Sequence, residues 1–381
     1  MSSKLSIQIV TFNSKRFLKD CLDSVFRQSF QDFSVLLIDN ASNDGTFEFV
    51  KNNYSEENIK REFGSSAKLF VVRNVRNLGF AQAHNQGIIL TDSEFVLVLN
   101  PDVILEPKFL ENLLKEADRD EGVGAVAGKL LKIKWGDREV EEKIKTDIID
   151  SVGLRILKSR RFVDRGAGEK DKKRYGKKVE IFGVSGACVL YRRSALEDVR
   201  VPDEMDKVRL HSRQTRATVD AQFSNQIKDL EKIGEYFDRD FFAYQEDNDL
   251  AWRLRLRGWK AVYAPQAVAY HFRSAGVKGD AALFEIAKAH SHRSKIIEYL
   301  SFRNNLWLLF KNDYGVNVFL HLHFILFHLT LKKIYLLSTQ PINFFKSGLA
   351  FYQGLPRMLR KRKYIIKRAK VGPREIRKWM E

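Results

Sequence analysis

The amino-acid sequence predicts an α/β fold with a parallel, doubly wound sheet, followed by a basic helical region. Segments with strand character alternate with segments of helical spacing through the first third of the chain. The run Phe95–Leu99 contains five consecutive apolar residues, as expected of a central parallel strand that is covered on both faces. With 381 residues, of which 44% are hydrophobic, the chain is long enough and apolar enough to form two domains, or one large domain with an appendage.

The predicted elements follow one another at regular intervals. Strands are expected at residues 5–11, 33–38, 69–72 and 95–99, where apolar and β-branched residues dominate. Helices are expected at residues 17–26, 46–54, 81–90 and 107–117, where apolar residues recur with helical spacing. The last of these begins with a proline, which suits the first turn of a helix. This alternation favours a parallel, doubly wound sheet.

Two polar stretches interrupt the second half of the sheet domain. Residues 134–178 are heavily charged, and we interpret them as hairpins or loops across the sheet rather than as a separate domain. Residues 198–235 form a second polar stretch, and loops of this length are usually functional or disordered. A helix is expected to begin near Glu246, and a later strand is expected to end at His271.

The positive charge is concentrated at the carboxyl end of the chain. The whole chain has 66 Lys and Arg against 48 Asp and Glu, whereas residues 301–381 have 16 against three. Residues 316–337 are strongly apolar, but four polar residues fall on one helical stripe: Asn317, His321, His328 and Lys332. This pattern predicts a helix that lies in a membrane interface and does not cross it. The alternative is a helical bundle that packs on the body of the protein.

Cysteine content and the amino terminus indicate the compartment. With only Cys21 and Cys188, no disulfide framework is implied, and a reducing compartment fits. The first five residues contain no apolar signal segment, so we expect a cytoplasmic body that binds peripherally to the inner face of the membrane. No G-x-G-x-x-G follows the first strand and no Walker lysine loop is present, which argues against dinucleotide oxidoreductases and P-loop enzymes.

Polar residues follow four of the predicted strands or precede the next helix, in the segments 11–13, 39–46, 77–80 and 100–102. In a doubly wound sheet these positions line one crevice, where ligands bind. The residue types suit a nucleoside diphosphate. Asp39 can accept from a pyrimidine imide N–H, Gly79 allows a phosphate to approach a helix start, and Asp102 can hold a divalent cation. Taken singly, Asn100-Pro101-Asp102 also suits a turn, and Asp44 also suits a helix N-cap.

A second acidic group lies at the predicted helix start, where Glu246, Asp247 and Asp249 fall within four residues. Carboxylates at a helix N-terminus are favoured by the helix dipole, which gives a structural explanation. Flanking aromatic residues would lower the local dielectric and make one carboxylate a usable general base. His271, at a strand end downstream, is a candidate metal ligand.

These segments together resemble the inverting family-two glycosyltransferases with the GT-A fold, and within them the rhamnosyltransferase-like branch. The resemblance covers about residues 4–312 and depends on the order and spacing of its motifs. The segments that carry it are residues 9–13, 39–46, 77–81, 99–102, 186–187, 237–238, 241–242, 246–250, His271 and 302–305.

The resemblance implies a doubly wound mixed sheet, a nucleoside-diphosphate sugar donor and a divalent cation, Mg²⁺ or Mn²⁺. Asp102 matches the last acid of the family's D-x-D motif, in which Asn100 replaces the first acid. Asp247 matches the general base, and His271 matches a position that completes the metal shell. The donor-binding residues expected are Thr11, Phe12, Asn13, Asp39, Asp44, Asn77, Gly79, Asn100 and Asp102. The acceptor-binding residues expected are Gly186, Glu246, Asp249 and Trp252.

The expected activity is inverting transfer of a sugar, with rhamnose as the first expectation, from a dTDP- or UDP-linked donor. The expected acceptor is a hydroxyl of a lipid-linked or polysaccharide glycan in cell-wall or other cell-surface polysaccharide biosynthesis. The alternatives are the same fold with a galactofuranosyl, mannosyl or glucosyl donor, or an inactive protein that binds a membrane or an anionic polymer. No nucleic-acid partner is expected, because no recognition motif accompanies the basic residues. The expected domains are residues 1–300, the transferase, and 301–381, the basic helical region.

Overall fold

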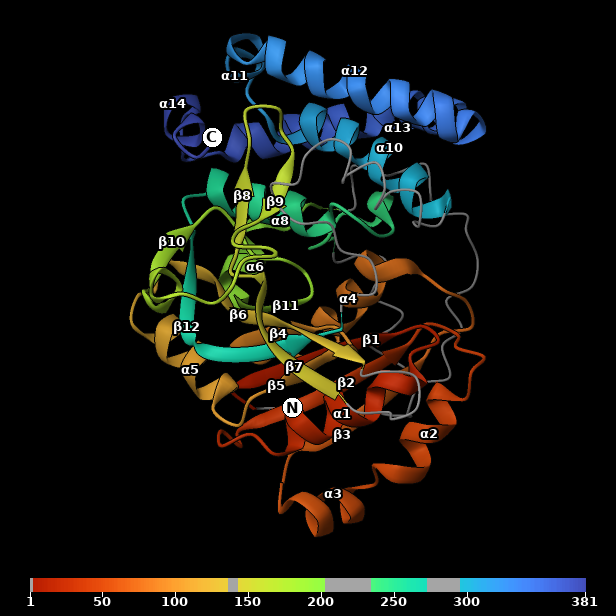
Figure 1. Cartoon of the computed structure of the whole chain (residues 1–381), viewed down its shortest axis with the longest axis vertical. Helices are drawn as coiled ribbons and strands as arrows, with labels where there is room; N and C mark the ends of the chain where they lie inside the picture. The colour runs from red at the N-terminus through yellow and green to blue at the C-terminus, as the bar shows by residue number, and fades with distance from the viewer. Residues whose placement is uncertain (1–2, 136–142, 203–233, 273–294) are drawn as a thin grey trace.

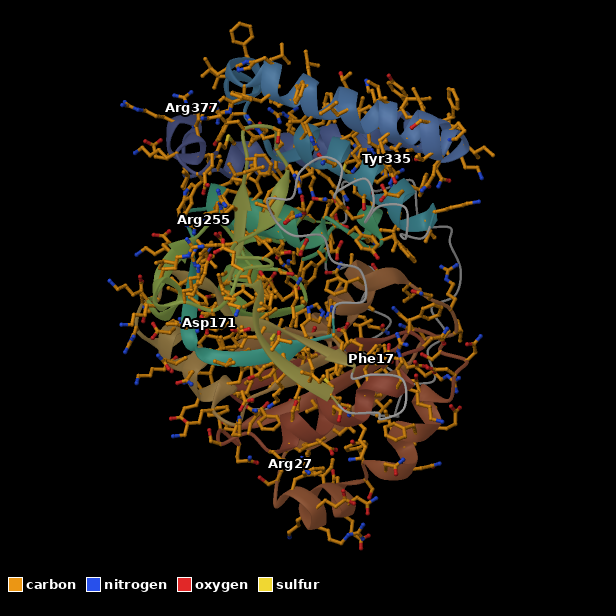
Figure 2. All side chains as sticks on the ribbon, in the orientation of Figure 1. Phe17, Arg27, Asp171, Arg255, Tyr335 and Arg377 are labelled. Carbon is orange, nitrogen blue, oxygen red and sulfur yellow. The ribbon has the colours of Figure 1, made fainter. Side chains whose placement is uncertain are left out.

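The structure is a computed structural model that describes residues 3–135, 143–202, 234–272 and 295–381. Figure 1 shows a twisted sheet in the lower half of the molecule and a layer of helices across the top. The side chains fill the space between these two parts, from Phe17 beside the sheet to Tyr335 in the helical layer (Figure 2). Most of the predicted 198–235 insertion lies outside the described residues.

The large sheet has the strand order β10-β12-β6-β11-β4-β1-β2-β3, with β5 paired to β12 and β7 paired to β6. Its first strands are β1 (Leu5–Thr11), β2 (Phe33–Asp39), β3 (Lys68–Arg73) and β4 (Phe95–Leu99), and all their mutual pairings are parallel. The later strands are β5 (Val103–Leu105), β6 (Val123–Trp135), β7 (Lys143–Ser151), β10 (Val179–Ile181), β11 (Cys188–Arg192) and β12 (Lys260–His271). Because β11 runs antiparallel to both β4 and β6, the sheet as a whole is mixed.

Helices cover both faces of this sheet. They are α1 (Lys15–Phe26), α2 (Thr46–Asn53), α3 (Glu56–Phe63), α4 (Gly79–Ile89), α5 (Phe109–Asp118), α6 (Arg193–Val199) and α8 (Glu246–Leu256). All five residues of β4 are buried, as the apolar run predicted. Side chains alternate across a strand, so Leu97 packs in the core beneath α1 and α5, whereas Val96 and Val98 pack in the core beneath α4 and α8.

The charged stretch after β6 is part of the sheet domain, as predicted. Within it β7 pairs antiparallel with β6, and β8 (Leu154–Ile156) pairs with β9 (Phe162–Asp164) as a two-stranded hairpin. A short 3₁₀ helix, η1 (Lys173–Gly176), follows. The turn of the β8–β9 hairpin carries Arg160, which is buried and pairs with the Asp313 carboxylate at 2.7 Å. This pair ties the excursion to the helices at the carboxyl end of the chain.

The carboxyl-terminal helices pack on the body of the protein. They are α10 (Lys295–Asn312), α11 (Gly315–Leu320), α12 (Leu322–Thr339), α13 (Pro341–Arg368) and α14 (Pro373–Arg377). A third core cluster joins Trp252 of α8 with Trp307 of α10 and with Met358 and Ile365 of α13. The bundle alternative therefore describes α10 and α13, and the predicted boundary between residues 300 and 301 falls within α10.

The polar stripe of α11 and α12 turns toward the protein. Asn317 and His321 are buried, and the Arg160 guanidinium donates to the Asn317 carbonyl at 2.9 Å and lies 2.9 Å from His321 Nδ1. The opposite side exposes large apolar residues, among them Phe319 at 76% and Phe327 at 66%. Among the helices that the structure describes, none is both long enough and apolar enough to cross a membrane.

Candidate active site

The loops after β1 and β2 form one hydrogen-bonded unit around Asp39. Its buried carboxylate accepts from Thr11 Oγ1 at 3.1 Å, from the Ser42 amide at 3.2 Å and from the Ser42 hydroxyl. Arg73 Nε, at the end of β3, lies 3.5 Å from the same carboxylate. Asp39 and Thr11 therefore have local partners that shape the loops at the sheet edge, in addition to any contact with a nucleobase.

A second set of contacts fixes the chain on either side of this unit. Asn13 has a left-handed backbone with φ of 53°, and its Oδ1 accepts from the Asn43 amide at 2.9 Å. The Asp44 carboxylate accepts from the Lys15 amide at 3.1 Å and from the Thr46 amide at 3.0 Å. Burial disfavours its charged form, but these hydrogen bonds outweigh burial and lower the pKa of Asp44.

Phe12 is an exposed aromatic residue among those expected to bind the donor. Its ring is 50% exposed directly after β1, beside the turn that Asn13 makes. An exposed aromatic ring among buried polar neighbours is a surface on which a planar nucleobase can stack.

Gly79 starts α4, where the sequence predicted the approach of a phosphate, and its close neighbour in the structure is Phe242. Its φ is +80°, and a Cβ atom there would lie 2.5 Å from the Phe242 carbonyl oxygen. Asn77 Oδ1 accepts from the Gly79 amide at 2.8 Å, and the Ala81 amide donates to the Phe242 carbonyl at 3.2 Å. The start of α4 is thus in direct contact with the loop that precedes α8.

The strand end at Asp102 meets the strand end at His271. Asp102 Oδ1 lies 3.3 Å from His271 Nε2, and the Phe272 amide donates to the Asp102 carbonyl at 3.0 Å. His271 Nδ1 lies 2.8 Å from the Asp150 carboxylate of β7. Burial by itself would lower the pKa of His271, but the two carboxylates outweigh burial and raise it to about 9. Asn100 holds the neighbouring backbone, with its amide 2.8 Å from the Ala187 carbonyl.

Asp102 and His271 fit one side of a cation site. Among the described residues no group of three or more His, Cys, Asp or Glu side chains could hold a metal ion, so the protein offers a pair of ligands. A carboxylate behind a histidine fixes the tautomer that leaves the other nitrogen free for a metal, and Asp150 has this place behind His271. Mg²⁺ commonly takes one or two protein ligands and completes its shell with substrate phosphates and water.

Asp247 is held by backbone amides from two segments. Its Oδ2 accepts from the Gly186 amide at 2.9 Å, and its Oδ1 accepts from the Asn248 amide at 2.8 Å. The side chain remains partly exposed at the start of α8. Burial raises the pKa of Asp247, and the two amides limit that increase. A carboxylate that is fixed, reachable and more basic than usual has the properties of a general base.

Glu246 is buried beside this carboxylate. Burial, and after it the charge of Asp247, raises the pKa of Glu246 well above its usual range. Its Oε2 has no hydrogen-bond partner among the described residues. Burial therefore favours the protonated form of Glu246 beside Asp247.

Two residues expected on the acceptor side lie in the interior instead. Asp249 is buried and pairs with Arg253 and Lys311, each at 2.8 Å. Trp252 is buried among aromatic rings that include Phe182. Successive positions on a helix point in different directions, so only some residues of the acidic cluster at the start of α8 can face the crevice.

Sequence reasoning missed Asp150 and Asn304. Asp150 lies in the charged excursion, where nothing in the sequence distinguishes it from its acidic neighbours. Asn304 lies in the segment 302–305, which contributed to the resemblance without a role. In the structure it reaches the loop before α8. Both depend on contacts between residues that are more than 50 positions apart.

Comparison with known proteins identifies the family of the chain. Residues 6–200 match the family model described as Glycosyl transferase family 2. The chain is 26% identical over 315 residues to an N-acetylglucosaminyl-diphospho-decaprenol L-rhamnosyltransferase of Mycobacterium tuberculosis, which covers 81% of this chain and 87% of that protein. It is 25% identical over 127 residues to the glycosyltransferase GlyG of Streptococcus pneumoniae, which covers 32% of this chain and only 39% of GlyG.

Solved structures agree on the fold. GalNAc-T7 with UDP, GalNAc and Mn²⁺ superimposes with a TM-score of 0.52 at 11% identity, over 96% of this chain and 56% of that one. TarS 1–349 of S. aureus with UDP-GlcNAc superimposes with a TM-score of 0.50 at 14% identity, over 96% of this chain and 90% of that one. The chain has the GT-A fold and belongs to glycosyl transferase family 2, as its strand-end motifs predicted.

Proposed function

We propose that this glycosyltransferase inverts the anomeric centre of a sugar that it moves from a nucleoside diphosphate to an acceptor hydroxyl. The observation that carries the proposal is Asp247, which is partly exposed and whose two oxygens are fixed by the amides of Gly186 and Asn248. One fixed base suffices for a single displacement with inversion. A hydrolase would need a second carboxyl group to protonate the leaving oxygen.

In the proposed reaction Asp247 takes the proton of the acceptor hydroxyl. The acceptor oxygen forms a bond to the anomeric carbon while the bond from that carbon to the diphosphate oxygen breaks on the opposite side. The leaving diphosphate departs with the bonding electron pair. The amino-terminal end of α4 lies at Gly79, where the helix dipole would favour a phosphate.

A divalent cation, Mg²⁺ or Mn²⁺, is part of the proposal. Asp102 and His271 would hold it, with Asp150 fixing the His271 ring. A bound cation neutralises negative charge on the departing diphosphate. Support comes from the Mn²⁺ in the GalNAc-T7 structure, which shares the fold.

The donor proposed first is dTDP-rhamnose, with UDP-linked sugars next, and the acceptor proposed is a lipid-linked glycan of the cell surface. The support is the mycobacterial relative, which covers most of both chains and whose name states rhamnosyl transfer to a diphospho-decaprenol acceptor. Galactofuranose, mannose and glucose donors are the alternatives within the same fold.

The first experiment is a screen of nucleotide sugars for thermal stabilisation, with and without Mn²⁺. A ligand at 100 times its dissociation constant stabilises a protein by about 2.7 kcal/mol, so a true donor gives a clear shift in Tm. Transfer from the selected donor to N-acetylglucosaminyl-diphospho-polyprenol is then measured for the wild type and for Asp247→Asn.

Asp247→Asn keeps the size of the side chain and removes the base. We expect transfer to fall at least about 10²-fold, the lower range for general-base catalysis, while donor affinity stays within twofold. Transfer at the wild-type rate would show that Asp247 is not the base. A failure of every nucleotide sugar to stabilise the protein would instead support the inactive, membrane-binding alternative.

We further propose that α11 and α12 rest on an anionic membrane surface. Phe327 and Ile334 are 66% and 59% exposed and, seven residues apart, share one side of α12. Exposed Lys333 lies on the same helix, and Lys346 and Lys363 are exposed on α13. Apolar side chains beside lysines suit the interface of a bilayer that contains anionic lipids.

The test uses Phe327→Ser with Ile334→Ser in the full chain. Removing α13 would also open the core around Met358, so truncation would not isolate membrane binding. We expect the double variant to lose co-sedimentation with vesicles of phosphatidylglycerol and phosphatidylcholine while it keeps its Tm. Unchanged co-sedimentation would exclude this face of α12 as the contact.

A further inference from the structure

The loop between η4 (Arg239–Phe241) and α8 has an unusual backbone. Phe242, Tyr244 and Gln245 have positive φ angles of 64°, 69° and 76°. Residues with a Cβ atom rarely adopt this conformation, and they keep it only where the surroundings hold them. Glu246 and Asp247 follow at once, so the shape of this loop sets where the proposed base begins.

Asn304 of α10 binds three carbonyls of this loop. Its Nδ2 lies 2.9 Å from the Phe241 oxygen, 2.9 Å from the Ala243 oxygen and 2.7 Å from the Tyr244 oxygen. An amide nitrogen has two hydrogens, so three carbonyls share them. Asn304 is fully buried.

Arg303 fixes the orientation of the Asn304 amide. Its Nε and Nη2 lie 2.9 and 2.8 Å from Asn304 Oδ1, which leaves the Asn304 nitrogen toward the loop. Arg303 Nη2 also donates to the Asp240 carbonyl at 2.9 Å. Together Arg303 and Asn304 bind four backbone carbonyls, those of Asp240, Phe241, Ala243 and Tyr244, in the segment before α8.

The other side of the loop contacts the donor side of the crevice. The Phe242 carbonyl accepts from the Ala81 amide at 3.2 Å, and Gly79 has no room for a Cβ atom because Phe242 fills that space. The loop is thus held between α10 and the start of α4. The position of the loop therefore determines where Asp247 lies relative to the crevice in which the donor is proposed to bind.

We infer that Asn304 is a positioning residue for sugar transfer: it holds the left-handed loop 241–245 and thereby places the Asp247 carboxylate against the acceptor hydroxyl. This inference rests on the proposed assignment of Asp247 as the base. It gives the helix α10, at the other end of the chain from the donor loops, a part in the reaction.

The variant that tests it is Asn304→Asp, which has the same shape but no N–H groups to donate. We expect kcat to fall about 10²-fold, the cost of a displacement near 1 Å at a reacting group. The dissociation constant and stoichiometry of donor binding should stay within twofold of wild type. General damage to the fold would instead lower kcat and binding stoichiometry together.

Asn343→Asp is the matched control. Asn343 of α13 also donates to a backbone carbonyl of α10, that of Lys295 at 2.7 Å, but it lies in the same helical layer away from the loop. It should keep kcat within twofold of wild type. Rates are measured with dTDP-rhamnose, or the donor that the screen selects, and N-acetylglucosaminyl-diphospho-polyprenol, well below the Tm of each variant.

The outcomes separate this inference from the proposed function. If Asp247→Asn abolishes transfer but Asn304→Asp keeps the wild-type kcat, the inference is overturned and the base assignment stands. If Asp247→Asn transfers normally, the base assignment itself fails. Asn304→Ala, which adds no charge, replaces the aspartate variant if that variant does not fold. If neither Asn304→Asp nor Asn304→Ala folds, Asn304 is required for stability alone, and the inference is overturned.

Discussion

Lys361→Met should destabilise the protein strongly, because Lys361 is a buried cation with three carboxylate partners. Its Nζ lies 2.5 Å from Glu235, 2.6 Å from Asp238 and 3.1 Å from Asp240. Lys361 is 2% exposed, and it belongs to α13, whereas its partners lie just before and within η4. This contact holds the carboxyl-terminal helix to the segment that leads to the proposed base.

Methionine keeps most of the volume of lysine and removes only the charge. Loss of one partner from a buried ion pair costs about 3–5 kcal/mol, because the buried carboxylates then keep only their other partners, which include Lys311 for Asp238, Arg357 for Asp240 and Arg239 for Glu235. At about 2.1 cal/mol/K for each of the 381 residues, the entropy of unfolding is about 0.8 kcal/mol/K. The expected decrease in Tm is therefore about 4–6 °C, measured by calorimetry.

The loss should grow as the pH rises. Burial and the Asp238 charge raise the pKa of Glu235 to about 7 even with Lys361 present. Without Lys361 the native carboxyls hold protons more tightly, whereas the unfolded chain releases them above about pH 4.5. A native state that binds more protons than the unfolded state loses stability as pH increases. The decrease in Tm should be larger at pH 8 than at pH 5.

Lys363→Met is the matched control, since Lys363 is exposed two residues further along α13. It should change stability by less than about 0.5 kcal/mol, as surface substitutions usually do. A double-mutant cycle with Glu235→Gln isolates the pairwise energy. A Lys361→Met variant within about 1 kcal/mol of wild type, or one whose loss is the same at pH 5 and pH 8, would refute the reasoning.

Three further predictions concern the crevice. Gly79→Ala should lower the free energy of unfolding by at least about 1–3 kcal/mol, because the new Cβ would meet Phe242 at a left-handed φ. The control is Gly348→Ala, whose Cβ would have no atom within 4 Å and which should leave thermal stability unchanged or raise it. Asp150→Asn should weaken Mn²⁺ affinity about 10–100-fold in calorimetric titration, and an unchanged affinity would remove it from the metal site. Because burial raises the pKa of Asp247, kcat should fall on acidification at a higher pH than an ordinary aspartate gives, and a flat profile down to pH 4 would contradict this.

Local pattern was sufficient to predict the first half of the fold. The strand at residues 5–11 was predicted with the bounds that β1 has, and all four predicted strands exist with parallel pairing. The apolar run at 95–99 requires burial on both faces, and burial on both faces requires helices on both sides. The contact between Asp102 and His271 could also be predicted from the sequence, because both residues lie at the ends of their strands.

Other features depended on packing that the sequence does not encode locally. The basic charge of residues 301–381 favoured a region that binds a membrane, but Met358 and Ile365 lie in the core and Lys361 lies among carboxylates. Composition cannot distinguish a lipid surface from a protein surface that offers the same apolar contacts and negative charge.

The sequence by itself determined the sheet, the strand-end motifs and the family, because these depend on residues that are close along the chain. Only the tertiary structure decided which acidic residues face the crevice and which form ion pairs in the interior. Asp247 and Asp249 are two positions apart, yet one is fixed by amides at the surface and the other is paired with Lys311 inside. The choice between them depends on the direction of α8 and on α10, which begins almost 40 residues after α8 ends.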